Sequence, residues 1–350
     1  MAEVRSGPVP YVYVCTRMRV RKSKLIPRED YLRLLNMSIP EITRFIEETQ
    51  YKKEIDELAA FFHGVDLLEI ALSWNLAKEY QEIQKITPGV LKRFTQSYLR
   101  KWDIQNVLTI FRGKAQGMKA GKIREILVPA GEFDKAFLDR LLKEDSLERI
   151  VDALKGQSIY PVIAEGFSTA IEEESFAKIE NDLFQQFYAN LLSEARSGLK
   201  GGKRFLEYIL LDIDMINIRN MFRLRADRLQ QDASTMVIPG GTFSIDDFER
   251  LINLEDQGEF IDSLKSHVTL KPLLSLLDEI GAKSLREVEI ELIKVQLSQM
   301  ESLSKLNPFS IHPILTYLEK KKYEIFNLRA IARGKKALLP VERIRGYLVM

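Results

Sequence analysis

Apolar residues in the middle of the chain recur at intervals of three and four positions. Between positions 208 and 224 they include Leu211, Met215, Ile218 and Phe222. This spacing places the side chains along one face of an α-helix. No segment combines alternating apolar and polar positions with the turn residues of a β-hairpin. The pattern therefore predicts an all-α fold.

One helical phrase occurs three times, at 105–112, 216–223 and 326–333. Each copy has asparagine at its second position and arginine at its last. A second repeated element lies on another long predicted helix, where an apolar residue is followed by Glu, two variable residues and Leu. The polar residues of both elements recur about 110 positions apart, in the order Glu69, Asn106, Arg112, Glu180, Asn217, Arg223, Glu289, Asn327, Arg333. Repetition at a long, fixed period indicates three copies of one structural unit.

Segments rich in proline and glycine follow the first two copies of the phrase, at 128–131 and 238–241. Such segments end helices and mark connections. The first unit also begins with an additional predicted helix, from Val12 to Val20. The predicted units are residues 1–129, 130–240 and 241–350.

Short predicted helices open each unit and share a pattern at the start of one helix. A Ser or Asp that accepts from a free backbone amide is followed three residues later by a Glu that reaches back. The predicted capping boxes are Ser38 with Glu41, Asp145 with Glu148, and Asp256 with Glu259.

Two long helices in each unit are expected to form an antiparallel hairpin. The repeated Glu lies about 19 residues before the helix-breaking turn and the Arg about 24 residues after it. At a rise of about 1.5 Å per residue, both groups lie roughly 30 Å from the turn. We therefore expect each Glu to pair with the Arg or Asn of its own unit. The favoured interpretation is structural, and the alternative is that the arginines face a common partner.

Composition narrows the function classes. The 350 residues are 45% hydrophobic, and 52 Lys and Arg against 50 Asp and Glu leave a net charge of +2. This balance predicts no general attraction to nucleic acid or to an anionic membrane. The single cysteine, Cys15, suits a reducing compartment. We predict neither a signal peptide nor a membrane span, because no apolar run approaches the roughly 18 residues that a span requires.

The candidate catalytic motifs are each incomplete. The segment Gly117–Ile123 resembles a phosphate-binding loop, but three residues separate its glycines instead of four and Ile123 replaces the required Ser or Thr. The basic turn at 198–204 is more simply a solvated turn. The three histidines are far apart in the sequence, which disfavours a zinc site. We expect no catalytic, cofactor-binding or metal-binding residues.

The chain as a whole resembles the C subunit of A/V-type rotary ATPases, a protein that is similar to the d subunit of the vacuolar enzyme. The resemblance rests on Tyr11, Tyr13, Arg17 and Arg19 at the start, the helix beginning at 31–35, and the threefold repeated elements.

That resemblance implies a funnel of three similar helical bundles around a pseudo-threefold axis. In such a protein, the wide mouth receives the rotating axle, formed by subunits D and F, and the narrow face sits on the membrane proteolipid ring. The implied function is non-catalytic: the funnel couples ATP synthesis or hydrolysis to ion transport, without a cofactor. The implied location is peripheral, on the cytoplasmic face of the membrane among other ATPase subunits.

Two alternatives remain open from the residues alone. One is a generic helical-repeat scaffold that binds another protein, which an open superhelix would favour. The other is an enzyme with an undetected site in a central cavity. A pocket in which ionisable groups with strongly shifted pKa values converge would favour the enzyme.

Overall fold

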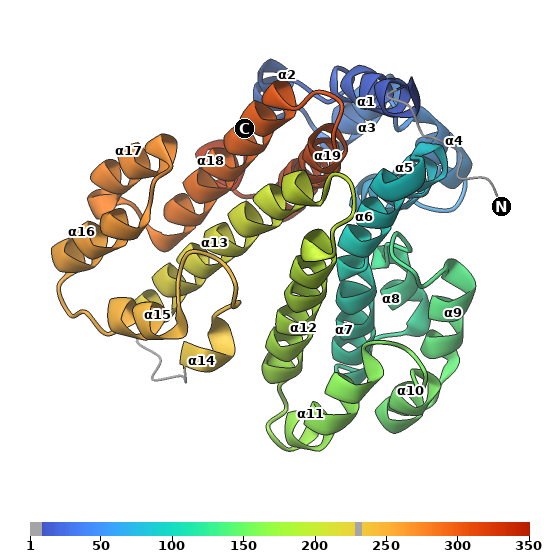
Figure 1. Cartoon of the computed structure of the whole chain (residues 1–350). Coiled ribbons are helices and arrows are strands. Elements are labelled where there is room, and N and C mark those ends of the chain that lie inside the picture. Colours follow the sequence, from blue (N-terminus) through green and yellow to red (C-terminus); the bar gives the residue numbers. More distant parts are fainter. Residues whose placement is uncertain (1–8, 228–232) are drawn as a thin grey trace.

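The computed structural model describes residues 9–227 and 233–350 (Figure 1). Within these residues the chain forms α-helices and one short 3₁₀ turn, with no β-strand. The predicted all-α fold is therefore confirmed.

The additional N-terminal helix is α1 (Val9–Lys22), which confirms the helix expected from Val12 to Val20. Val14, Cys15 and Met18 are fully buried, and their spacing gives α1 one apolar face. This face packs along α19, near the other end of the sequence.

Three short helices open each repeat and precede its long helices. They are α2 (Arg28–Leu34), α3 (Ile39–Glu47) and α4 (Lys52–Leu58) in the first repeat; α9 (Lys135–Lys143), α10 (Leu147–Ala153) and α11 (Tyr160–Glu172) in the second; and α15 (Ile245–Ile252), α16 (Gln257–His267) and α17 (Lys271–Glu279), followed by the 3₁₀ turn Ile280–Ala282, in the third.

Long helices follow the short ones, and each repeat then ends in a short helix. The first repeat has α5 (Gly64–Ile86), α6 (Gly89–Leu99), α7 (Lys101–Ala115) and α8 (Ala120–Ile126); the second has α12 (Ala177–Arg196), α13 (Gly202–Asp227) and α14 (Ala233–Met236); and the third has α18 (Leu285–Leu306), α19 (His312–Lys336) and α20 (Val341–Arg345). Arg100 between α6 and α7 keeps right-handed helical torsions, with φ −58° and ψ −19°. The helices α6 and α7 therefore continue one another.

The long helices pack in a closed cycle. Helix α7 contacts α12, α12 contacts α13, α13 contacts α18, and α18 contacts α19. Helix α19 then packs against α5, so the last repeat meets the first. In Figure 1, α12 and α13 lie close together at one end and diverge toward the other. A closed cycle is not the open superhelix expected of a generic helical-repeat scaffold.

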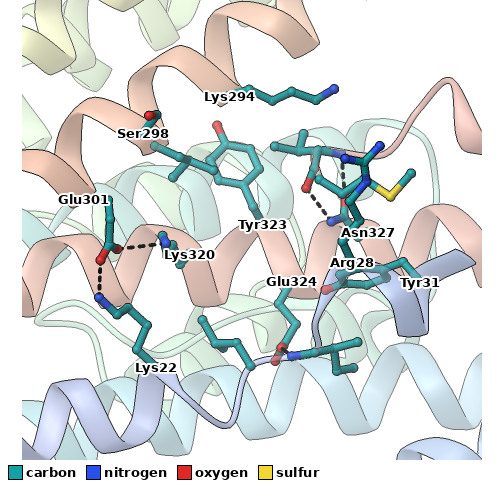
Figure 2. Close-up of a pocket in the computed structure, with 15 residues that line it drawn as sticks. Lys22, Arg28, Tyr31, Lys294, Ser298, Glu301, Lys320, Tyr323, Glu324 and Asn327 are labelled. Carbon is teal, nitrogen blue, oxygen red and sulfur yellow. Dashed lines mark hydrogen bonds and ion pairs between the residues drawn. The ribbon is translucent and has the colours of Figure 1, made fainter.

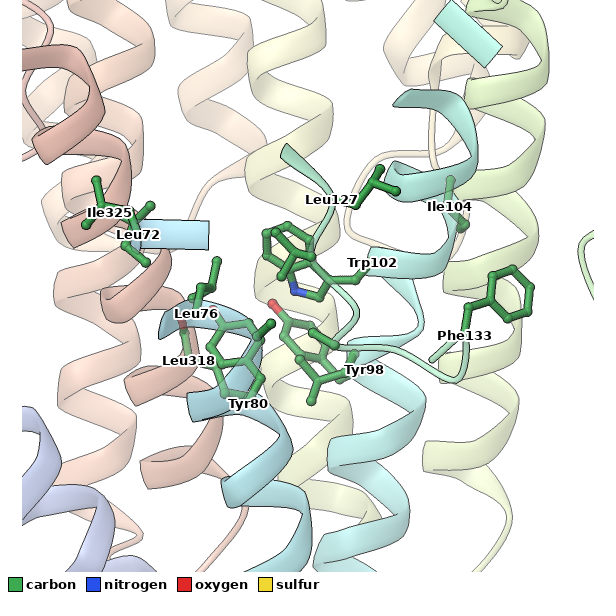
Figure 3. Packing of buried hydrophobic residues seen from close by; sticks show 14 of the residues in the cluster. Leu72, Leu76, Tyr80, Tyr98, Trp102, Ile104, Leu127, Phe133, Leu318 and Ile325 are labelled. Atoms are coloured by element: carbon green, nitrogen blue, oxygen red, sulfur yellow. Dashed lines mark hydrogen bonds between the residues drawn. The ribbon is translucent and has the colours of Figure 1, made fainter. Parts of the chain in front are cut away.

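Aromatic side chains join the long helices where the hairpin turns meet. The Phe94 and Phe205 rings stack with centroids 4.5 Å apart, which joins α6 to α13. Tyr80 and Trp102 make an edge contact at 6.0 Å, and Figure 3 shows Tyr80 near Leu76 of α5 and Leu318 of α19. This buried apolar surface is the main source of stability in the assembled cycle.

One of the three predicted capping boxes is complete, and the N-cap residue of a second is confirmed. Ser38 and Glu41 form a complete capping box at the start of α3. Asp256 caps α16 by accepting a hydrogen bond from the Glu259 backbone amide at 2.8 Å.

The predicted box of Asp145 with Glu148 is wrong by one residue. The N-cap of α10 is Ser146, whose hydroxyl accepts from the Arg149 amide. Asp145 lies outside the helix and accepts from the Arg149 side chain instead. Two adjacent residues were both suitable caps, and the backbone turn selects the serine.

Replacing Ser146 by Ala should therefore lower the free energy of unfolding by about 1 kcal/mol, because the α10 amide loses its acceptor. The matched variant Asp145→Ala should change it by less than about 0.5 kcal/mol. Denaturant titration of both variants measures the difference. A larger loss of unfolding free energy in Asp145→Ala than in Ser146→Ala would indicate that Asp145 is the cap, as the sequence predicted.

Candidate functional site

The repeated arginines and glutamates form ion pairs between successive repeats. We call these pairs the three clasps: Arg112 with Glu180, Arg223 with Glu289, and Arg333 with Glu69. The expectation that each Glu pairs within its own unit is therefore wrong. Equal distances from the turn place the groups at equal heights, but helix packing decides which neighbour each arginine faces. Helices α7, α13 and α19 present their arginines to α12, α18 and α5.

The third clasp closes the cycle across 264 residues of sequence. Arg333 binds Glu69 through two hydrogen bonds, from Nε at 2.6 Å and from Nη2 at 2.8 Å. The hydrogen bond from Arg333 lowers the pKa of Glu69, although partial burial opposes this shift. Paired, parallel bonds of this kind fix geometry as well as add energy.

All three clasps are partly open to solvent. The arginine side chains are 46%, 53% and 59% exposed in chain order. An exposed ion pair contributes only about 0–1 kcal/mol. The clasps therefore set the register between neighbouring helices more than they stabilise the fold.

The repeated asparagines have a different role from the arginines. Each asparagine is buried. Its side-chain amide forms two hydrogen bonds with the backbone of one residue about 22 positions later, accepting from the N–H and donating to the C=O. The pairs are Asn106 with Val128, Asn217 with Ile238, and Asn327 with Val349, at distances of 2.7–2.9 Å. Buried backbone groups outside helices need such partners. The asparagines thus hold the chain segments that leave each repeat, and they do not pair with the repeated glutamates.

An acidic residue lies three positions before each asparagine, and the sequence interpretation missed it. Asp103 accepts from the backbone amides of Glu132 at 2.8 Å and Phe133 at 2.9 Å. Asp214 accepts from the Thr242 amide and hydroxyl at 2.6 and 2.7 Å. The constant offset from the asparagine was a signal available in the sequence.

Glycine is required where the connecting chain passes these carboxylates. A Cβ atom at Gly131 would lie 2.3 Å from an oxygen of Asp103, and one at Gly241 equally close to an oxygen of Asp214. The proline- and glycine-rich segments therefore do more than end helices. They let the backbone approach the acceptor closely enough to be bound.

Glu324 occupies the same position in the third repeat but binds a distant segment. It accepts from the backbone amide of Ile26 at 2.6 Å and from Gln50 at 2.9 Å. It also bonds Tyr51 and Lys321, and both are fully buried. This group therefore ties the last repeat to the beginning of the first.

A second cluster of buried polar side chains lies at the centre of the cycle, around Glu319. The Glu319 carboxylate accepts a hydrogen bond from Tyr98 at 2.8 Å and pairs with Lys101 and Lys322. Burial alone would raise the pKa of Glu319, but the two ammonium groups outweigh burial and lower it. Tyr98 also lies 3.2 Å from the hydroxyl of Tyr208, which brings equivalent tyrosines of two repeats together. These ionisable groups bind each other, which favours a structural role over the undetected enzyme site.

Metal-binding side chains do not gather in the described part of the chain. Across residues 9–227 and 233–350, no three His, Cys, Asp or Glu side chains lie together in a way that would hold a metal ion. Over the same residues, no helix is long and apolar enough to cross a membrane.

These features define an all-α protein whose long helices pack in a closed cycle. The family model described as "ATP synthase (C/AC39) subunit" matches residues 14–347. The chain therefore belongs to the ATP synthase C/AC39 subunit family, and the sequence resemblance is confirmed.

Archaeal relatives match over nearly their whole length. The C subunit of the A-type ATP synthase of Methanococcoides burtonii is 38% identical, covering 97% of this chain and 94% of the relative. The corresponding protein of Halobacterium salinarum is 36% identical over 99% of each chain. That of Archaeoglobus fulgidus is also 36% identical, over 97% of this chain and 96% of the relative.

Charge exchange tests the partners in a clasp. Arg223→Glu should destabilise the protein by about 1 kcal/mol through repulsion with Glu289. Adding Glu289→Arg should recover most of that loss in a double-mutant cycle. Combining Arg223→Glu with Glu180→Arg should recover nothing, since Glu180 binds Arg112 and not Arg223. Recovery by Glu180→Arg, measured by denaturant titration, would support pairing within a unit.

The pH response of Asp103 provides a second test. Burial raises its pKa to about 6, although two backbone amides favour the charged form. Because the folded pKa exceeds the unfolded value of about 3.9, this group's contribution to stability is complete below pH 4 and is lost as pH rises toward 6. A carbon-13 NMR titration should show a carboxyl midpoint near 6 that disappears in Asp103→Asn. A midpoint at or below 4 would contradict burial as the dominant influence.

Proposed function

We propose that this protein is a non-catalytic central-stalk (rotor) subunit of an A/V-type ATPase. In this role it connects the axle subunits D and F to the membrane proteolipid ring, and so links ATP synthesis or hydrolysis to ion transport. Family membership supports the complex, since the relatives are named as C subunits of A-type ATP synthases. The observation that carries the rotor role is the closed cycle of long helices, with α19 packed against α5.

A connector that transmits torque must resist shear between its parts. The clasp of Arg333 with Glu69 and the bond from Ile26 to Glu324 both join the last repeat to the first. These two polar links add to the packing of α19 against α5 and α1, which already joins the third repeat to the first. Because the cycle of helices is closed, each repeat packs against two neighbouring repeats. This arrangement suits a rigid coupling element.

The proposed shape is a funnel of three bundles around a pseudo-threefold axis, with repeat boundaries at 129/130 and 240/241. The divergence of α12 and α13 from a common end is consistent with this shape (Figure 1). The proposed location is the cytoplasmic face of the membrane, where the protein contacts other ATPase subunits. Protein partners of this kind bind through large complementary surfaces, not through a few polar groups.

Co-purification tests this role. The protein should bind a co-expressed D and F pair, and separately a detergent-solubilised proteolipid ring, each with one copy per complex. Arg333→Glu should retain both partners but lower ATP-driven ion transport relative to ATP hydrolysis, because the cycle is held less firmly. The paired variant Arg333→Glu with Glu69→Arg should restore the ratio. Failure of the unmodified protein to bind either partner would overturn the proposal.

A further inference from the structure

A cavity of about 510 Å³ lies between α18, α19, the connection from α1 to α2 and the C-terminal residues (Figure 2). Its volume falls in the range of small-molecule sites, roughly 300–1,000 Å³. None of the clasps lines it, and the proposed coupling role does not require it.

Four cationic side chains from four different elements line this cavity. They are Lys22 at the end of α1, Arg28 on α2, Lys294 on α18 and Lys320 on α19. The whole chain has a net charge of only +2. Gathering four cations costs electrostatic free energy unless anions offset them.

The two carboxylates in the cavity wall are already engaged. Glu301 pairs with both Lys22 and Lys320, at 2.5 and 2.8 Å, and Figure 2 shows the three groups together. Burial would raise the pKa of Glu301, yet these two lysines hold it below its ordinary value. Glu324 is bound to the buried Lys321 behind the wall.

Arg28 and Lys294 form no ion pair with either carboxylate of the cavity wall. Arg28 has no ion pair within the described residues, and Lys294 pairs only with Glu291 of its own helix, outside this cavity. In Figure 2, Lys294 extends from α18, and Arg28 lies near Asn327. Arg28 is therefore the cation of this cavity that has no carboxylate partner among the described residues, which favours an anionic ligand here.

The rest of the lining is suited to an organic ligand. The side chains of Tyr323 and Ser298 carry hydroxyl groups that can donate hydrogen bonds. Leu25 and Leu297 add apolar surface to the wall, and Met350 is also part of the lining. A phosphate on an apolar body would satisfy both parts of the surface.

We propose that this cavity binds an organic phosphate. Its dianion is held by Lys294, Arg28 and Lys320, and its apolar part lies against Leu25 and Leu297. Such a ligand bridges α18 to α19 and to the start of the first repeat, so it reinforces the closed cycle. The same chemistry is offered by a soluble phosphate ester and by an anionic lipid headgroup.

Calorimetric titration with phenyl phosphate tests the site in the full-length protein. We expect saturable binding of one molecule per chain, with weaker binding of inorganic phosphate and none of benzyl alcohol. The double variant Arg28→Gln with Lys294→Gln should bind phenyl phosphate at least tenfold more weakly. Both side chains are at least partly exposed, so the variant should keep the native circular dichroism and melting temperature.

A matched control separates the site from general attraction. Lys92→Gln with Lys200→Gln removes the same charge from exposed positions outside the cavity and should leave binding unchanged. Equal weakening in both double variants, or no saturable binding by the unmodified protein, would overturn the proposal.

Vesicles of phosphatidylcholine with phosphatidylglycerol identify the source of the phosphate. Sedimentation with these vesicles that is lost in Arg28→Gln with Lys294→Gln would assign the site to a lipid headgroup. Phenyl phosphate binding without such sedimentation would assign it to a soluble ester. Either result supports an organic phosphate site.

Discussion

The packing of α19 against α5 is the contact on which the rest of the architecture depends. Each long helix has neighbours on two sides, and the first and last can satisfy this only by meeting each other. Apolar burial drives the contact, while two polar links determine its register. Arg333 forms an ion pair with Glu69 at the solvent-exposed end of the two helices, and the buried Glu324 accepts a hydrogen bond from the Ile26 amide. The cycle therefore closes in one alignment.

The same pair of hydrogen-bonding side chains fixes the chain segment that leaves each of the first two repeats. An asparagine binds both backbone groups of one residue, and an acid three positions earlier binds an amide farther along. In the third repeat, the acidic residue binds a different part of the chain. Asp103 and Asp214 reach amides within about 30 residues, whereas Glu324 reaches Ile26 at the opposite end of the sequence.

The sequence predicted the elements well because helical periodicity, caps and proline-glycine breaks are local signals. It also identified Asn217 and Arg223 as repeated residues, and in the structure both bind other parts of the same chain. It did not predict their partners. Spacing along a helix determines height, but the neighbour that Arg223 faces depends on how all three repeats pack. The cap of α10 was misplaced because Asp145 and Ser146 satisfy the same local rule.

The distribution of polar contacts also determines where the molecule is stiff. Near the hairpin turns, Glu319 is buried among Lys101, Lys322 and Tyr98, and removing one partner from a buried ion pair costs about 3–5 kcal/mol. At the far ends, the exposed clasps contribute about 0–1 kcal/mol each. Shear at the centre therefore costs much more than small displacements at the ends. In the coupling role proposed above, the rigid centre is the part suited to transmitting rotation, and the outer ends are the parts suited to adjusting to a partner.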